Sequence, residues 1–270
     1  MMYDNVLFWF LLIGHLTGDF YFQTKNMVAG KEAGKKSSMT LHILFYSLAV
    51  FVFLLPVISW YIIIILPIIA ATHLTVDIFK IKIINHCKEK VGEIESKFIW
   101  IKKWIFVVDQ ILHIAIICII ASFYASNKLI AISCIGNFAI FIHNNLQIAL
   151  SPKEFLQICF VFVFIIKPVS VWVTELKSPP ENIEPPTNEL LTNQSKKYRG
   201  GEIIGYLERV LVVIMMFTKN YSAIGLIFTA KSITRQKRFA DEAFAEYYLI
   251  GSLLSILLAV LSVVIVKISI

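Results

Sequence analysis

Residues 8–25 read FWFLLIGHLTGDFYFQTK, an apolar run that contains one histidine and one aspartate. In a soluble core this pair would be ordinary, whereas in a bilayer each polar side chain is costly unless something stabilises it. The rest of the chain decides between the two settings. Of its 270 residues, 58% are hydrophobic and 21 are Phe, which exceeds the ~45 to 50% apolar share of soluble domains. The sequence therefore indicates a polytopic membrane protein.

Apolar segments of about the 20 residues needed to span a ~30 Å hydrocarbon core recur along the chain. Together they predict an all-α transmembrane bundle of about seven to nine membrane segments, the shortest of which are candidates for interfacial or re-entrant helices. The first lacks a basic stretch before it and a cleavage pattern after it, so we expect a retained helix rather than a signal peptide. The segments are 5–23, 39–56, 60–79, 104–124, 128–150, 155–174, 203–218, 221–231 and 244–268.

The net charge of +7 is concentrated in short loops between these segments. Residues 24–38 hold four Lys against one Glu, and residues 80–103 hold seven Lys against three Glu. Because cytoplasmic loops carry the excess of basic residues, we expect both loops in the cytoplasm and the N-terminus outside. Membrane lipids are then the expected partners and nucleic acid is not, while the sequence leaves the oligomeric state open.

A stretch rich in Pro, Asn and Glu at 175–200 is typical of a solvated loop. We expect a four-helix transmembrane core at 1–124, membrane segments of open topology at 125–174 and C-terminal transmembrane helices at 201–270. The basic stretch KSITRQKR at 231–238 also belongs in the cytoplasm by the charge rule. That placement needs an odd number of crossings after the core, which conflicts with the four segments placed there.

The opening pair, His15 and Asp19, has a spacing of four residues that places both side chains on one helix face. The same spacing recurs in ATHLTVDIF (71–79) and, in reverse order, in VVDQILHIA (107–115). Roughly 0.2 such pairs would arise by chance. The first and third spans run inward and the fourth runs outward. In each pair, therefore, we expect the His nearer the outer side of the membrane and the Asp nearer the cytoplasm, so that the pairs form matching layers. His42 adds a ligand from the second span at similar depth.

Imidazole nitrogens and carboxylate oxygens are ligands of zinc and of other divalent first-row ions. We therefore predict a site for one or two divalent ions near the cytoplasmic side, most simply zinc, with manganese or iron as alternatives. The ligand set exceeds the three or four that one catalytic zinc uses, so either two ions bind or some members act as acid, base or support. The candidate ligands are His15, Asp19, His42, His73, Asp77, Asp109 and His113.

The candidate catalytic residues are Asp109, Asp19 and Gln23. Gln23 and Gln110 are also candidates to hold metal ligands in place. Hydrogen bonding or ion pairing between helices would also explain the three pairs. We expect no cation inside the first four spans to neutralise their carboxylates, and this favours a metal. The four cysteines are scattered without a CxxC pair and predict neither a thiolate site nor a disulfide framework.

Other polar residues have simpler interpretations. His143, in FIHNNLQ, is expected to pack between helices, and His86, in a Lys-rich loop, is expected to be solvated. Lys167, Glu208 and Arg209 would close a pocket, bind an anionic head group or pair internally. The basic stretch at 231–238 is expected to meet anionic lipid phosphates.

Several of these stretches also resemble a known family. GHLTGDFYFQTKNM, HLTVDIFK and DQILH are similar to the core block of the bacterial integral membrane proteins called domain of unknown function 3307, or DUF3307. GYLERVL, AKSITR and AEYYLIGSLLS resemble the C-terminal extension of its longer members. The resemblance implies a multi-pass protein of the bacterial cytoplasmic (inner) membrane and gives weight to the His and Asp pairs, but it names no reaction. The layout is also similar in kind to membrane hydrolases of the alkaline ceramidase type, without a matching motif order.

These features favour a membrane-embedded, metal-dependent hydrolase acting on an ester, amide or phosphodiester of a lipid or lipid-linked molecule. The metal would activate water and Asp109 would take its proton. A divalent-cation or proton-coupled transporter is the main alternative. The apolar residues before His15 and after His113 favour a site open to one side only. A third hypothesis is a sensor or assembly subunit with a structural metal, which predicts a closed coordination shell.

Overall fold

The computed structural model of the chain consists of helices joined by short connections where it is described, which is at residues 6–57, 60–91, 96–124, 144, 150–177, 188–236 and 239–268. By length and composition, five of its helices can cross a membrane, and a shorter apolar helix covers Val6–Phe22. The protein is therefore a helical membrane protein, although the expected count of seven to nine segments is not confirmed. The segment expected at 128–150 lies outside the described residues except at its residues 144 and 150. The five long helices are Lys36–Val57, Ile62–Val91, Ser96–Phe123, Pro152–Leu176 and Glu242–Lys267.

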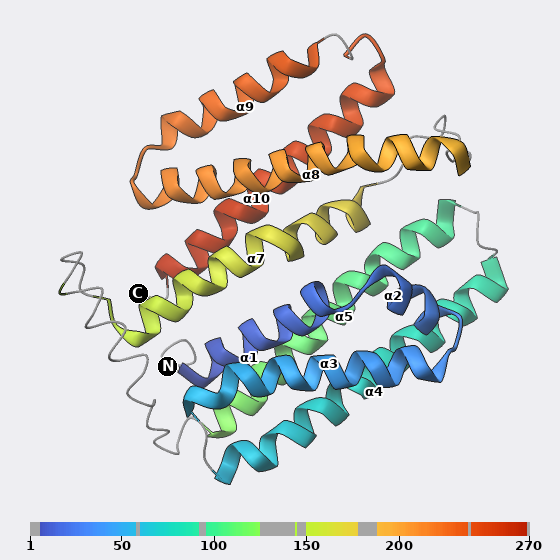
Figure 1. Ribbon diagram of the computed structural model, residues 1–270, viewed down its shortest axis with the longest axis vertical. Helices are drawn as coiled ribbons and strands as arrows, with labels where there is room; N and C mark the ends of the chain where they lie inside the picture. Colours follow the sequence, from blue (N-terminus) through green and yellow to red (C-terminus); the bar gives the residue numbers. More distant parts are fainter. Residues whose placement is uncertain are drawn as a thin grey trace. The chain divides into compact units, whose positions relative to one another are not determined.

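The first of two compact units, Met1–Val163, is built on a bundle of four helices. Helix α1 contacts α3 and α5, and α4 contacts the same two helices, so the four close into a ring. Consecutive members of the ring run antiparallel (Figure 1). The bundle helices are α1 (Val6–Leu16), α3 (Lys36–Leu54), α4 (Trp60–Val91) and α5 (Ser96–Tyr124). They correspond to the four spans expected in the first half.

This bundle buries a group of polar side chains beside apolar ones, and apolar side chains also cover its outside. The candidate ligands are buried, with His15 0% and His42 1% exposed. The outside of a soluble bundle is mostly polar instead. The outer surface is therefore suited to lipid. Exposed apolar residues on it include Leu44, Leu48, Ile63, Ile64, Phe79, Ile111, Ile119 and Phe123.

Two glycines bring α1 and α3 into close contact. A Cβ atom on Gly18 would lie 2.7 Å from Cδ2 and 3.1 Å from Cα of Tyr46, and one on Gly14 would lie 3.0 Å from Cα of Val50. Small residues four apart allow helix backbones in membranes to approach closely. Because these glycines alternate with His15 and Asp19 along the chain, the close packing also carries the first polar pair toward α3.

Both basic loops of the first half contain more helix than expected. Residues 24–38 include α2 (Lys25–Glu32), which contacts α3 and α4. The N-terminus of α2 is capped by Thr24, whose Oγ1 accepts from Met27 N at 3.3 Å. The expected loop at 80–103 is largely helical, since α4 continues to Val91 and α5 begins at Ser96. Lys and Glu favour helices and no Gly or Pro interrupts residues 80–91, so these helices extend beyond their apolar spans.

The second unit, Phe164–Ile268, contains the later part of α7 (Pro152–Leu176), then α8 (Asn188–Phe217), α9 (Tyr221–Arg235) and α10 (Glu242–Ile268). Helix α8 contacts both α9 and α10. It begins inside the stretch that was expected to be a loop, because the prolines of that stretch end at residue 186. The segments expected at 203–218 and 221–231 form α8 and α9, which are not among the five long apolar helices.

Candidate metal centre

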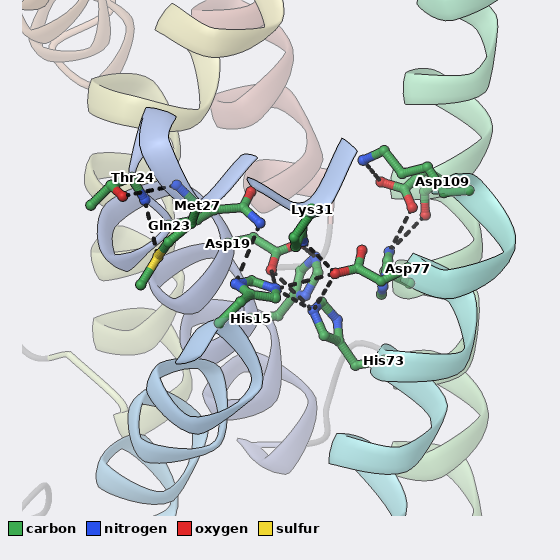
Figure 2. Close-up of polar contacts among 12 residues, drawn as sticks. His15, Asp19, Gln23, Thr24, Met27, Lys31, His73, Asp77 and Asp109 are labelled. Carbon is green, nitrogen blue, oxygen red and sulfur yellow. Dashed lines mark hydrogen bonds and ion pairs between the residues drawn. The ribbon is translucent and has the colours of Figure 1, made fainter. Parts of the chain in front are cut away.

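All four bundle helices contribute to one buried polar cluster. The structure brings together every predicted ligand, and their ligand atoms fall into three overlapping groups whose members lie within 4.8 Å of one another. Figure 2 shows Asp19, His73 and Asp77 converging, with Lys31 reaching toward the same point. The groups are His15, Asp19 and His73; His42, His73 and Asp77; and Asp77, Asp109 and His113.

Asp19 reaches this cluster from an unusual stretch of helix. Residues Thr17–Phe22 continue α1 as a π-helix, η1, whose wider turn differs from the regular helix assumed in spacing arguments. Such turns occur frequently at functional sites. The π-helix ends at Gln23, which has extended backbone angles (φ −75°, ψ 111°). As a result, Asp19 turns toward α3 and α4 as well as toward His15 on its own helix, and Oδ1 of Asp19 lies 3.2 Å from Nε2 of His73.

The spacing of the central atoms matches that of ligands around one small cation. Nε2 of His42 lies 3.0 Å from Nε2 of His73 and 3.3 Å from Oδ2 of Asp77. Oδ1 of Asp19 lies 3.2 Å from the His73 nitrogen and 3.5 Å from the His42 nitrogen. Ligands held about 2.0 to 2.1 Å from a tetrahedral zinc are roughly 3.3 Å apart. Asp19, His42 and His73 are therefore spaced as a coordination shell would space them, whereas Asp77 lies farther from His73, with its Oδ2 at 3.9 Å from Nε2 of His73.

Many atoms of the cluster lack hydrogen bonds within the described part of the chain. Buried polar atoms are paired in roughly 90% or more of cases, so a concentration of unpaired atoms points to a missing ligand. Asp19 Oδ1 makes no hydrogen bond despite the two imidazole nitrogens beside it. The residues present thus fit a divalent metal ion. The unpaired atoms are Nδ1 and Nε2 of His15, Oδ1 of Asp19, Nδ1 of His73, Oδ1 of Asp109 and Nε2 of His113.

Two lysines from outside the four expected spans enter the cluster, so the expectation that no cation neutralises its carboxylates is wrong. Nζ of Lys31 donates to Oδ2 of Asp77 at 2.5 Å, and Nζ of Lys80 donates to Oδ2 of Asp109 at 2.7 Å. Ion pairing therefore accounts for two of the three carboxylates. Asp19 differs from them, because its ion-pair contacts in the described residues are with imidazoles.

The sequence holds a signal for only one of these lysines. Lys80 lies seven residues after His73 and three after Asp77, so all three share one helix face. Lys31 comes from α2, and its contact with Asp77 bridges 46 residues of sequence. No local spacing predicts such a contact, since it depends on how α2 packs against α3 and α4.

Further side chains hold the ligands in place. The amide of Gln23 lies 3.3 Å from Nδ1 of His42, so it supports this histidine rather than continuing the face of Asp19. The Gln110 amide donates to Oδ2 of Asp109 at 3.1 Å, as expected for a supporting residue. Tyr46 stacks on His73 with ring centroids 3.6 Å apart and an interplanar angle of 9°. The position of Tyr46 one helical turn after His42 is the sequence signal that could have found it.

One end of the cluster is closed by apolar side chains and the other carries the polar ones. Residues 7–13 of α1, on the far side of His15 from Asp19, are all buried and apolar. Buried apolar residues of the other three helices continue this seal: Val50 and Leu54; Ile62, Ile65 and Ile69; and Ile117 and Ile120. At the opposite end lie Gln23, Lys31 and Lys80, the last with a side chain that is 26% exposed. The cluster therefore has one apolar and one polar end.

The remaining polar residues singled out in the sequence form no part of this cluster. Glu208 accepts from Nζ of Lys231 at 2.5 Å, so internal pairing describes it best and takes one lysine from the basic stretch. Arg209 is 5% exposed and bonds to backbone and Ser255 within the second unit. Lys167 and His86 are exposed, and His143 lies outside the described residues.

Comparison with known proteins adds one finding. The model of the family described as "Protein of unknown function (DUF3307)" matches residues 7–142, a range that includes every member of the polar cluster. No curated protein and no solved structure matches the chain.

Proposed function

We propose that this chain, which belongs to the DUF3307 family, is a membrane-embedded, metal-dependent hydrolase. Its substrate would be an ester, amide or phosphodiester of a lipid or a lipid-linked molecule. The observation that carries the proposal is the set of 3.0 to 3.5 Å spacings among Asp19, His42 and His73, which are those of a first-row coordination shell. Zinc is the simplest occupant, with manganese or iron as alternatives.

The chain's own residues divide into ligands and a base. Asp19, His42 and His73 would hold the ion with help from His15 or Asp77, and Gln23 would fix the His42 ring. A bound metal supplies an activated water and stabilises negative charge in the transition state. Asp109 is the candidate base, because Lys80 and Gln110 occupy its Oδ2 while its Oδ1 has no hydrogen-bond partner in the described residues.

Access from one end supports a hydrolase over a transporter. A transit path needs polar groups on both sides of the site, whereas the described helices close one end with buried aliphatic residues. The polar end carries lysines, so we place it toward the cytoplasm of a bacterium, with the N-terminus outside the inner membrane. A lipid head group or lipid-linked substrate would then enter from the cytoplasmic side.

The test is hydrolysis by the full chain in detergent, using a phospholipid that contains both carboxylic-ester and phosphodiester bonds. We expect release of a product that stops when the metal is chelated and resumes when zinc is restored. Asp109→Asn should lower kcat by roughly 10²- to 10⁴-fold, the usual contribution of a general base, and keep the ion held by Asp19, His42 and His73. His86→Ala, an exposed histidine of the same bundle, is the matched control. Hydrolysis that persists in chelator would contradict the proposal.

A structural metal is a second candidate, favoured by the low exposure of the ligands. The most exposed ligand side chain is that of Asp19, at 9%. A structural zinc contributes its binding energy to folding. Chelation should then unfold the purified chain and not merely abolish its hydrolytic activity. Far-ultraviolet circular dichroism and thermal unfolding on the chelated protein separate the two roles.

A further inference from the structure

We infer that a second divalent cation binds beside the first, held by Asp77, Asp109 and His113, with Asp77 shared between the two ions. The inference rests on the proposed function, since it adds an ion to the same centre. Ligand atoms of these three residues lie within 4.8 Å of one another. Their side chains are 4%, 2% and 3% exposed, so they form a built site rather than a surface cluster.

The number of ligands exceeds the needs of one ion. A catalytic zinc takes three protein ligands and a structural one takes four, and Asp19, His42, His73 and His15 already meet that number without α5. With one ion alone, Oδ1 of Asp109 and Nε2 of His113 would stay buried without a partner in the described residues. Because Asp77 belongs to a group on each side, it is suited to bridge two ions.

The hydrogen bond made by one ring nitrogen of His113 leaves the other nitrogen able to bind a metal. Its Nδ1 lies 2.9 Å from the backbone oxygen of Asp109, a contact in which the ring donates a proton to the carbonyl. A neutral ring with its proton on Nδ1 leaves the lone pair on Nε2. That Nε2 is buried and has no hydrogen-bond partner among the described residues. The tautomer that the backbone selects is thus the one a metal needs.

The two carboxylate oxygens of Asp109 also differ in their hydrogen bonding. Oδ2 accepts from Lys80 at 2.7 Å and from Gln110 at 3.1 Å, whereas Oδ1 is buried without a hydrogen-bond partner in the described chain. A second ion would take Oδ1 and leave the lysine contact intact. Asp109 would then act as a ligand instead of a base, and the second ion would help to activate the water directly.

The charge of a two-ion centre narrows the substrate class to phosphate esters. Three aspartates and two lysines sum to −1, so two divalent ions raise the sum to +3 and one ion raises it only to +1. A buried charge of +3 needs anionic ligands, which a hydroxide and a phosphate group supply. Two ions about 3.5 to 4 Å apart stabilise both the attacking and the leaving oxygen in phosphoryl chemistry. Neutral esters and amides offer no such charge.

The reaction is a hydrolysis that consumes one water. The water oxygen forms a bond to phosphorus and the bond from phosphorus to the lipid alcohol oxygen breaks. The proton lost by the water is returned to the leaving alcohol oxygen. The products are a phosphate monoester and an alcohol, and no oxidant or reductant takes part.

The first experiment counts metal in the full chain, purified in detergent and reloaded with zinc. We expect two equivalents in the wild type, one in His113→Gln and one in His42→Gln. His86→Gln is the matched control and should retain two. Elution volume and unfolding temperature in zinc-free buffer verify that each variant is folded. X-ray absorption on the zinc-loaded wild type should show a metal neighbour, which is a test that needs no variant.

The outcomes separate this inference from the proposed function. One equivalent in the wild type, or two retained in His113→Gln, overturns the second ion and leaves the hydrolase proposal standing. No metal in the folded wild type overturns both. The substrate class has its own probe, inorganic phosphate, which should bind the zinc-loaded wild type and bind His113→Gln at least 10-fold more weakly. Equal phosphate binding by the two proteins would overturn the assignment to phosphate esters.

Discussion

The two units of this protein each bury charged or polar residues in apolar helices, and Arg209 of the second unit differs in its hydrogen bonding from the His and Asp cluster of the first. In the second unit, Arg209 of α8 donates from Nε to the carbonyl oxygen of Ile165, and from its other two nitrogens to Ile166 O at 3.1 Å and Ser255 Oγ at 3.1 Å. Each of its nitrogens therefore has a partner. In the first unit, five of the seven candidate ligands have a buried atom with no hydrogen-bond partner in the described residues.

This contrast distinguishes polar residues that stabilise the fold from polar residues that are arranged to bind a ligand. Pro168 lies inside α7 and lacks the amide proton that an α-helix would use to bond to the carbonyl of residue 164, and Arg209 donates to the next two carbonyl oxygens, those of Ile165 and Ile166. The hydrogen bonds of the Arg209 side chain are therefore satisfied by groups of the protein itself. The histidines and aspartates of the bundle are arranged around a common space with acceptor atoms to spare, which is the arrangement that a cation completes.

The largest expected effect is the loss of zinc binding in His73→Ala, because His73 belongs to two of the three ligand groups. The loss should exceed the ~10- to 100-fold that removal of a supporting residue costs. Zinc at 100 times its dissociation constant should stabilise the wild type by about 2.7 kcal/mol and leave His73→Ala unchanged. Thermal unfolding in detergent, with His86→Ala as control, measures this. An undiminished zinc shift in His73→Ala would remove the cluster from consideration as a metal centre.

Arg209→Met should give the opposite pattern. It deprives Ile165 O, Ile166 O and Ser255 Oγ of a donor, and each unsatisfied buried group costs about 1 to 3 kcal/mol, so we expect a loss on the order of 3 kcal/mol. Zinc content should stay as in the wild type. Lys167→Met changes an exposed cation and should have little effect. If Arg209→Met lost zinc without losing stability, the distinction between the two units would fail.

Gly18→Ala tests the close packing that carries Asp19 to α3. The added Cβ would lie 2.7 Å from a ring carbon of Tyr46, and overpacking of this kind costs about 1 to 3 kcal/mol. Because Tyr46 stacks on His73, we also expect weaker zinc binding. Gly225→Ala, inside α9 where a Cβ would meet nothing within 4 Å, should stabilise by roughly 0.5 to 1 kcal/mol. Equal unfolding temperatures for these two variants would contradict the account.

The smallest effect is expected for Gln23→Leu. A Gln23 amide turned to accept from Nδ1 of His42 would leave that ring's Nε2 free for a metal. Losing it should weaken zinc binding about 10-fold, or 1.4 kcal/mol, whereas Gln23→Glu keeps an acceptor and should bind nearly as well. Titration with a fluorescent zinc chelator measures both. Identical affinities for the Leu and Glu variants would show that Gln23 plays no part.

The sequence predicted the features that are local along the chain. Apolar runs located the four helices of the bundle, and the spacing of four residues placed each His and Asp pair on one face, because helix periodicity fixes both. Tertiary packing determined the rest. Lys31 reaches Asp77 across 46 residues of sequence, and the π-helix that carries Asp19 packs against α3. The start of α8 at Asn188 was missed because loop composition was extended beyond the last proline.

The most direct test of the central claim is the metal content of the wild-type chain, purified in detergent without chelator and measured by mass spectrometry beside His73→Ala prepared in parallel. We predict one or two equivalents of zinc, manganese or iron in the wild type and almost none in the folded variant. A folded wild type that holds no metal, before and after incubation with zinc, would contradict the account.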